Sequence, residues 1–145
     1  MTSKLLSYLK YELQLLEEMV SLAESLRTSL TKWQLEEIEP LTTRNAQLAL
    51  ALRKAGEARL TIISAWLKIA KSRASEIKFS QLAKYFDGEE KRIYFQLRSD
   101  LKTSIDRLNA LNATNRILTN RARRTNAQLF EIVTRGKNTI CNKRV

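Results

Sequence analysis

Residues that break helices are nearly absent from this chain. Its 145 residues include three glycines and one proline, while leucine, alanine, glutamate, lysine and arginine are abundant. These abundant residues favour helix, whereas many tight turns rely on glycine or proline. So few breaking positions predict a small number of long helices and little β structure. A chain of this length is also expected to form one domain around a shared core.

The spacing of apolar residues divides the chain into three long helices. Apolar side chains recur every three or four residues over 3–30, which is the period of one helical face. The same period predicts a second helix that starts at Lys32, bends near Pro40 and reaches about Arg73. A third is expected to start near Asp87, where an acidic first turn suits the helix dipole.

The third helix is expected to end before Gly136, because glycine commonly adopts the left-handed conformation that terminates a helix. About 45 residues at about 1.5 Å each make this helix about 70 Å long, more than a compact domain needs. Residues 73–88 are predicted to form a connector with a short helix at 79–86. We therefore predict an all-α fold, an elongated antiparallel three-helix bundle or coiled coil with a short connector helix.

This pattern predicts a single helical domain at 1–136 and a basic flexible tail at 137–145. Cys141 falls in the tail and is assigned no function. Trp33 and Trp66 lie among apolar helical neighbours, so both are expected in the core. Gly56 interrupts an apolar stripe and marks either a close-packing point or a local break.

Composition excludes most familiar catalytic chemistry. The chain has no histidine and one cysteine, so it cannot build a Ser–His or Cys–His pair or a histidine-ligated metal site. We therefore expect no enzyme activity, no catalytic residue, no metal and no cofactor. No apolar run has signal-peptide or membrane-spanning length, so we expect a cytoplasmic protein that does not insert into a membrane.

Charge is distributed unevenly along the sequence. The first 39 residues carry four basic and seven acidic side chains, whereas residues from Arg107 onward carry nine basic side chains against Glu131 alone. This asymmetry suits an acidic partner, a nucleic-acid backbone or a membrane surface. It also suits an acidic first helix packed beside a basic last helix. Nucleic acid is disfavoured, because Phe130 is the only aromatic residue near the C-terminal arginines.

One stripe of the third helix combines apolar residues with asparagines. Most of its steps are three or four residues, so its members share a helical face: Leu97, Leu101, Leu108, Leu111, Asn115, Leu118, Ala122, Thr125, Leu129 and Ile132. We call this stripe the α-seam. Asn112 and Asn115 lie one turn apart, and a buried asparagine fixes helix register because it needs a hydrogen-bond partner. The α-seam therefore predicts a docking helix, facing either a partner or the chain's own bundle.

The residues of this helix resemble the C-terminal helix of the FlgN family of flagellar type III export chaperones. The resemblance rests on seven positions: Leu111, Asn112, Asn115, Leu118, Asn126, Leu129 and Val133. It extends to Glu12, Glu17 and Glu18 in the first helix and to Leu41, Arg44, Leu48, Leu52 and Arg59 in the second. Such chaperones are often acidic, whereas this chain is basic, with a basic face of Arg116, Arg121, Arg123, Arg124 and Arg135.

The resemblance implies a cytoplasmic chaperone without enzyme activity. Its C-terminal helix would bind hook-associated proteins, which form the hook-filament junction, at the seven positions above. It would prevent their premature assembly and deliver them to proteins of the export apparatus. Two alternatives stay open: a two-helix coiled-coil component of a type III export ATPase complex, and a nucleic-acid-binding helical bundle. Self-association into a homo-oligomer also stays open.

Overall fold

The chain folds into three long helices and a short helical connector. The structure is a computed structural model that describes the backbone of residues 1–143 and the side chains of residues 1–135. The long helices are α1 (Thr2–Thr31), α2 (Leu35–Leu67) and α5 (Gly88–Lys143). The connector contains α3 (Lys71–Glu76), α4 (Phe79–Leu82) and the 3₁₀ helix η1 (Ala83–Tyr85). Within the described backbone there is no strand, so the predicted all-α class is confirmed.

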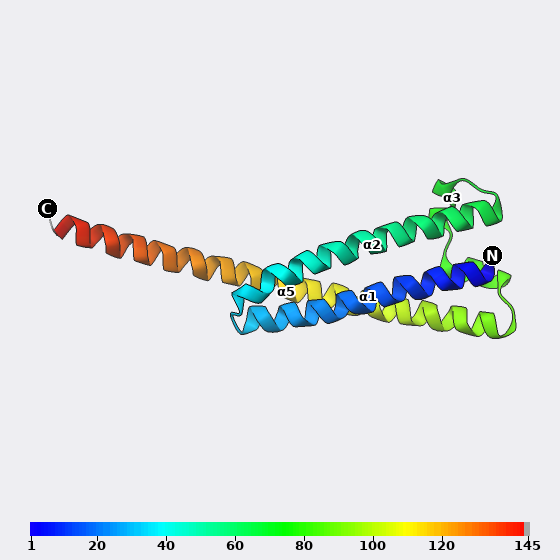
Figure 1. Cartoon of the computed structure of the whole chain (residues 1–145), viewed down its shortest axis with the longest axis horizontal. Helices are drawn as coiled ribbons and strands as arrows, with labels where there is room; N and C mark the ends of the chain where they lie inside the picture. Colours follow the sequence, from blue (N-terminus) through cyan, green and yellow to red (C-terminus); the bar gives the residue numbers. More distant parts are fainter. Residues whose placement is uncertain (144–145) are drawn as a thin grey trace.

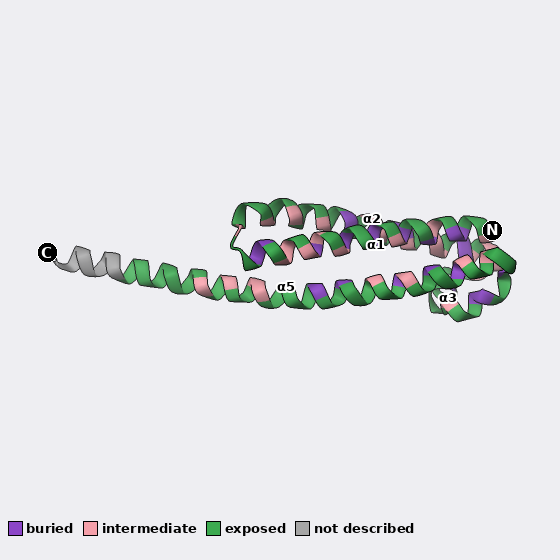
Figure 2. Cartoon of the chain, turned by 90° about the horizontal axis from the view of Figure 1, so that it is seen from below, coloured by how far each residue is buried: buried purple, intermediate pink, exposed green. Residues whose placement is uncertain are grey.

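The long helices run up, down and up. α1 and α2 form an antiparallel hairpin, and α5 then runs in the same direction as α1 (Figure 1). α1 lies between the other two and packs against both (Figure 2). The bundle is elongated, and α5 continues well past the turn that joins α1 to α2 (Figure 1). The molecule is therefore a helical bundle with one helix longer than its neighbours.

Burial along α1 explains its central position. Adjacent residues on a helix point about 100° apart, so burying both requires neighbours on two sides. Leu5 and Leu6 are both buried, as are Leu15 and Leu16. These side chains share one core with α2 and α5, to which the other helices contribute Leu48, Ala55, Ile63, Leu97, Leu101, Leu108 and Leu111.

An aromatic cluster fixes the start of α5 to the bundle. The rings of Phe86 and Tyr94 stack with centroids 4.3 Å apart, and Trp66 meets Tyr85 edge-on at 4.9 Å. The Tyr94 hydroxyl donates a hydrogen bond of 2.7 Å to the Phe79 carbonyl. Burial raises the pKa of Tyr94 to about 12. The cluster joins α2, the connector and α5 at the end of the bundle that holds the N-terminus.

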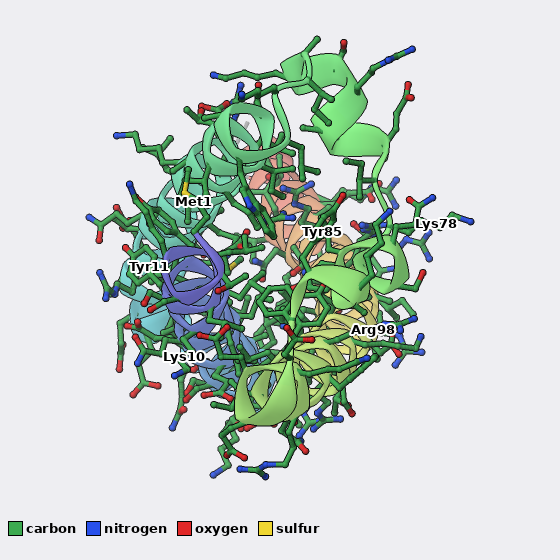
Figure 3. The ribbon with its side chains drawn as sticks, turned by 90° about the vertical axis from the view of Figure 1, so that its right-hand side faces the viewer. Met1, Lys10, Tyr11, Lys78, Tyr85 and Arg98 are labelled. Atoms are coloured by element: carbon green, nitrogen blue, oxygen red, sulfur yellow. The ribbon has the colours of Figure 1, made fainter. Side chains whose placement is uncertain are left out.

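Figure 3 looks along the bundle from this end. Lys10 and Tyr11 of α1 lie on one side, while Lys78 and Arg98 lie on the other, with Tyr85 between them. Polar and charged side chains surround the bundle, and apolar ones fill it. This arrangement follows the helical spacing of apolar residues.

The boundaries of α2 and α5 differ from the sequence prediction. α2 begins at Leu35, not Lys32, and ends at Leu67 instead of near Arg73, because Lys68 is left-handed with φ 55°. α5 does not end before Gly136 but continues to Lys143. Glycine costs a helix interior only about 1 kcal/mol, which is too little to stop a long helix by itself. The side chains of the predicted tail lie outside the described residues.

Trp33 is not in the core, so that prediction was wrong. It lies in the turn between α1 and α2 with φ 57° and is 48% exposed. The Gln34 amide donates to the Ser29 carbonyl across this turn, at 2.9 Å. That bond and the left-handed residue before it form a Schellman motif, which normally places glycine where Trp33 stands. The local turn therefore overrides the apolar character of Trp33, whereas Trp66 is half-buried in the aromatic cluster.

Candidate functional site

The first half of the α-seam packs against α1. Leu97, Leu101, Leu108 and Leu111 are buried, and Leu111 is only 1% exposed. They belong to the same core as the leucines of α1. This part of the seam therefore holds the bundle together.

Asn115 sets the register between α5 and α1. It is buried, and its Nδ2 donates a hydrogen bond of 3.0 Å to the carbonyl oxygen of Ala23. Such a bond has one favourable register, because sliding the helices would leave the Nδ2 donor unpaired in the core. Asn115 therefore faces the chain's own bundle, which is one of the two arrangements that the sequence left open. Asn112, three residues earlier, is exposed.

The register shows where α5 leaves the bundle. Asn115 lies level with Ala23, and α1 ends eight residues later at Thr31. Both helices rise about 1.5 Å per residue, so α5 passes the end of α1 roughly eight residues after Asn115. Leu118, Ala122 and Thr125 are accordingly half-buried, and every residue over 126–135 is exposed. We call residues 126–135 the overhang; Figure 2 shows this change along α5.

The overhang exposes large apolar side chains. Leu129 is 54% exposed, Phe130 74%, and Ile132 and Val133 66% each. A helix in water normally turns such residues toward a core. At about 100° per residue, these four lie next to one another on one side of α5, so they form one exposed apolar surface.

The arginines lie mainly on the other side of α5. At about 100° per residue, Arg116, Arg124 and Arg135 project away from Leu129. All five arginines of the basic face are exposed, and Arg135 pairs with Glu131 one turn away. Residues 116–135 contain five arginines and one glutamate, a net charge of +4. The second half of α5 is therefore an amphipathic helix with an apolar side and a cationic side.

One ion pair joins the acidic first helix to the basic last helix. Arg107 of α5 lies 3.2 Å from Glu24 of α1. Both side chains are about half exposed, so solvent screens the pair and its contribution to stability is small. Internal charge pairing thus accounts for part of the asymmetry in the sequence. The arginines of residues 116–135 lie closer to the end of the bundle or beyond it.

A buried ion pair inside the bundle was not predicted from the sequence. The Glu12 carboxylate is 2.9 Å from Nε of Arg59, and Glu12 is 6% exposed. Burial raises the pKa of Glu12 more than the nearby Arg59 lowers it. Gly56 lies beside this pair, where an added Cβ would be 3.6 Å from Oε1 of Glu12, an ordinary contact. Gly56 is thus inside α2 and does not break it.

The predicted client-binding residues separate into two groups. Leu111 and Asn115 are buried in the bundle, and Leu118 is half-buried beside it. The exposed group is Asn112, Asn126, Leu129 and Val133. Phe130 and Ile132 of the overhang were not among the predicted site residues. Their apolar character next to Leu129 and Val133 was the signal that could have found them.

The described residues contain no group of three or more side chains suited to holding a metal ion. Among the helices described, none combines the length and apolar character needed to cross a bilayer. A helical bundle that extends an amphipathic helix past its own core is a protein suited to binding other proteins.

Comparison with known proteins identifies the family. The family model FlgN, described as FlgN protein, matches residues 1–143, and the chain therefore belongs to the FlgN family. This is a family of flagellar export chaperones and not of enzymes, so the chain has a chaperone role in flagellum biogenesis. No curated protein and no solved structure matches the chain.

Proposed function

We propose that this protein is a cytoplasmic export chaperone for hook-associated proteins, which form the hook-filament junction. The second half of α5 binds the client, keeps its terminal helices from assembling early, and brings it to the export apparatus. The single observation that carries this proposal is the overhang, an apolar helical surface that the chain's own bundle leaves uncovered.

The physics of helix recognition supports this surface as the client site. A helix bound by another helix needs apolar anchors one turn apart, and Leu129 and Val133 have that spacing. Leu118 adds a half-buried apolar anchor nearer the bundle, and Asn126 adds an exposed amide three residues before Leu129. Covering the apolar face of a client helix would also remove the surface through which clients associate.

Leu111 and Asn115 contribute differently in this proposal. Because both are buried against α1, they position the client-binding half of α5 and do not contact the client while the bundle is intact. A client that reached them would have to displace α1 from α5. The overhang needs no such rearrangement, so it is the primary contact.

The fold favours this proposal over the coiled-coil alternative. A stalk-like component of an export ATPase complex would be a two-helix hairpin without connector helices. This chain has three long helices, with α3, α4 and η1 between the second and third.

The test is capture of a hook-associated client by a variant with Leu129→Glu and Val133→Glu. Both positions are exposed, so the bundle should remain folded while two charges enter the apolar surface. We expect client capture in a pull-down to be lost while the circular dichroism spectrum stays helical.

The matched control is Ile117→Glu. Ile117 is 54% exposed on the same helix, on the side away from Leu129. Client capture should be unaffected by this change. Capture that survives the double substitution, or that Ile117→Glu abolishes equally, would overturn the assignment of the overhang as the client site.

A further inference from the structure

The bundle is open on one side, between α2 and α5. α1 packs against both of these helices, but they form no comparable interface with each other in the part of the chain that the structure describes. Figure 2 shows α1 between them. Helices that pack on one another in all pairs would close the core on every side. Here the space over α1, between α2 and α5, has no long helix to cover it.

A groove with a volume of about 430 Å³ lies on this open side. Leu16 of α1 contributes to its floor, and Leu101 and Ile105 of α5 form one wall. Ile105 is 44% exposed, although it is a large apolar residue. The opposite wall, on α2, includes Ala49 and Gly56, whose small size leaves the groove wide. The groove therefore offers apolar surface and enough space for side chains of another helix.

The connector already fills one end of the open side. The Phe79 ring of α4 stacks on Tyr94 of α5 with centroids 5.6 Å apart, and the Arg59 guanidinium of α2 lies 6.0 Å from the centre of the same ring. Leu82 of α4 is buried in the shared core. Phe79 also lines the groove, so the groove begins beside α4. The chain thus places a short helix of its own between α2 and α5 at one end and leaves the adjacent space uncovered.

The open side continues toward the turn between α1 and α2. A smaller hollow lies there, between Ala23 and Leu26 of α1, Leu41 of α2 and Asn112 of α5. From Glu12 to Leu26 the groove and this hollow extend along about fourteen residues of α1, or about 21 Å. A helix of about fourteen residues has the same length.

The α5 wall of the open side is cationic. Four polar residues share the side of α5 that Ile105 occupies. They lie seven residues before it and four, seven and eleven residues after it, and all four are exposed: Arg98, Asn109, Asn112 and Arg116. The two aspartates of this stretch lie five residues before Ile105 and one residue after it, so they point to other sides of α5. Lys78 lies on the same side of the bundle as Arg98 (Figure 3).

The charged residues of the α2 wall are also arginines. Arg53 and Arg59 both line the groove. Among the described residues, Glu12 is the only acidic side chain that lines it, and the buried ion pair with Arg59 neutralises this charge. Arg53 lies 3.6 Å from Glu57, but both side chains are exposed and solvent screens the pair. The rim of the groove therefore carries positive charge on both walls.

We propose that the groove between α2 and α5 receives an acidic amphipathic helix of a partner protein. The apolar face of this helix covers Leu101 and Ile105, and its flanking carboxylates pair with Arg53 and Arg98. The bound helix continues the position that α4 begins and adds a fourth helix to the bundle. Positive charge on both walls attracts an acidic helix and repels a basic one. The groove lies outside the overhang, so this proposal does not rest on the proposed function.

The experiment uses two synthetic peptides of about fourteen residues, each held helical by a side-chain cross-link. The first has leucines at every third or fourth position and glutamates on both flanks. The second has lysine in place of each glutamate. Fluorescence anisotropy of the labelled peptides, titrated with the full chain, gives the dissociation constants. We expect the acidic peptide to bind and the basic peptide to bind at least about tenfold more weakly.

Two variants test where the acidic peptide binds. Ala49→Trp fills the groove from an exposed position on α2, so the bundle should stay helical by circular dichroism. Arg53→Glu with Arg98→Glu reverses the charge on both walls, also at exposed positions. Each variant should raise the dissociation constant of the acidic peptide at least about tenfold.

Each variant has a matched control. Ala110→Trp introduces the same ring at an exposed position on the opposite side of α5 from Leu101. Lys10→Glu with Lys54→Glu makes the same change in net charge at exposed sites. Lys10 lies on the other side of the bundle from Arg98 (Figure 3), and Lys54 points away from the groove. Both controls should bind the acidic peptide as the wild type does.

Four outcomes would overturn the proposal. The wild type could bind the two peptides equally or not at all, or Ala49→Trp and Ala110→Trp could have the same effect. Loss of acidic peptide binding in the variant with Leu129→Glu and Val133→Glu would place the peptide on the overhang. A wild-type dimer that Ala49→Trp abolishes would show that a second copy fills the groove. None of these measurements uses the client, so the two proposals can fail separately.

Discussion

The two halves of α5 share one spacing of apolar residues but have different surroundings. Its first half packs on α1 through Leu97, Leu101, Leu108 and Leu111, and its start is fixed by the aromatic cluster around Tyr94. Its second half continues the same α-seam with Leu129 and Ile132 exposed. An apolar seam stabilises the fold only where a neighbouring helix covers it, and α1 ends at Thr31. Equivalent residues therefore stabilise the bundle in one half and are available for binding in the other.

The largest expected difference is in the free energy of unfolding, between substitutions at two leucines of the α-seam. Leu111→Ala removes a side chain that is 1% exposed, so it should lower the free energy of unfolding by about 2–5 kcal/mol. Leu129→Ala, at a site 54% exposed, should change it by less than about 0.5 kcal/mol. Urea denaturation of dilute protein measures both values. Similar losses at the two positions would mean that the overhang is covered within the monomer.

A smaller difference in the free energy of unfolding is expected between substitutions at Asn115 and Asn112, which lie at the boundary between the two halves of α5. Asn115→Ala removes the hydrogen bond to Ala23 and leaves a small cavity, so the free energy of unfolding should fall by about 1–2 kcal/mol. Asn112→Ala changes an exposed side chain and should have an effect below about 0.5 kcal/mol. The same denaturation experiment measures both. Equal effects would show that the buried amide does not set the register.

The turn that ends α1 can be tested with Trp33→Gly. Glycine removes the strain of a left-handed residue, so the free energy of unfolding of the dilute monomer should rise by about 1 kcal/mol. The control is Lys54→Gly in the interior of α2, which should lower it by about 1 kcal/mol. A loss of stability with Trp33→Gly would show that the ring makes a stabilising contact in the monomer.

The smallest expected effect is a dependence of stability on pH, and it arises from Glu12, which is buried in the bundle. Burial raises the pKa of Glu12 above 4.5, so the folded state keeps this proton to a higher pH than the unfolded state does. That contribution to stability is fully present below pH 4.5 and is lost as the pH rises through the folded pKa. The wild type should therefore lose stability relative to Glu12→Gln as the pH rises from 4.5 through the raised pKa. Denaturation over a pH series measures this, and a constant difference would contradict it.

Much of the fold could be predicted from the sequence, because helical periodicity is local. The three long helices were predicted and are observed, whereas the binding of a partner by the last helix stays a prediction. The predictions for the end of α2 and for Trp33 were wrong, because a left-handed backbone conformation at Lys68 and at Trp33 determines the local structure. Left-handed residues other than glycine cannot be recognised reliably from a sequence. The buried pair of Glu12 and Arg59 was missed because its partners are brought together only by packing of α1 on α2.

The sequence by itself determined that the chain is helical, that α5 carries one continuous apolar seam and that its second half is cationic. Tertiary structure alone decided where that seam stops being core. The dividing point depends on the end of α1 at Thr31 and on the register fixed by Asn115 against Ala23. Register is a relation between helices distant in the chain, so no local pattern in α5 can specify it. The same period of leucines thus yields a packed helix before Asn115 and an exposed apolar surface after Thr125.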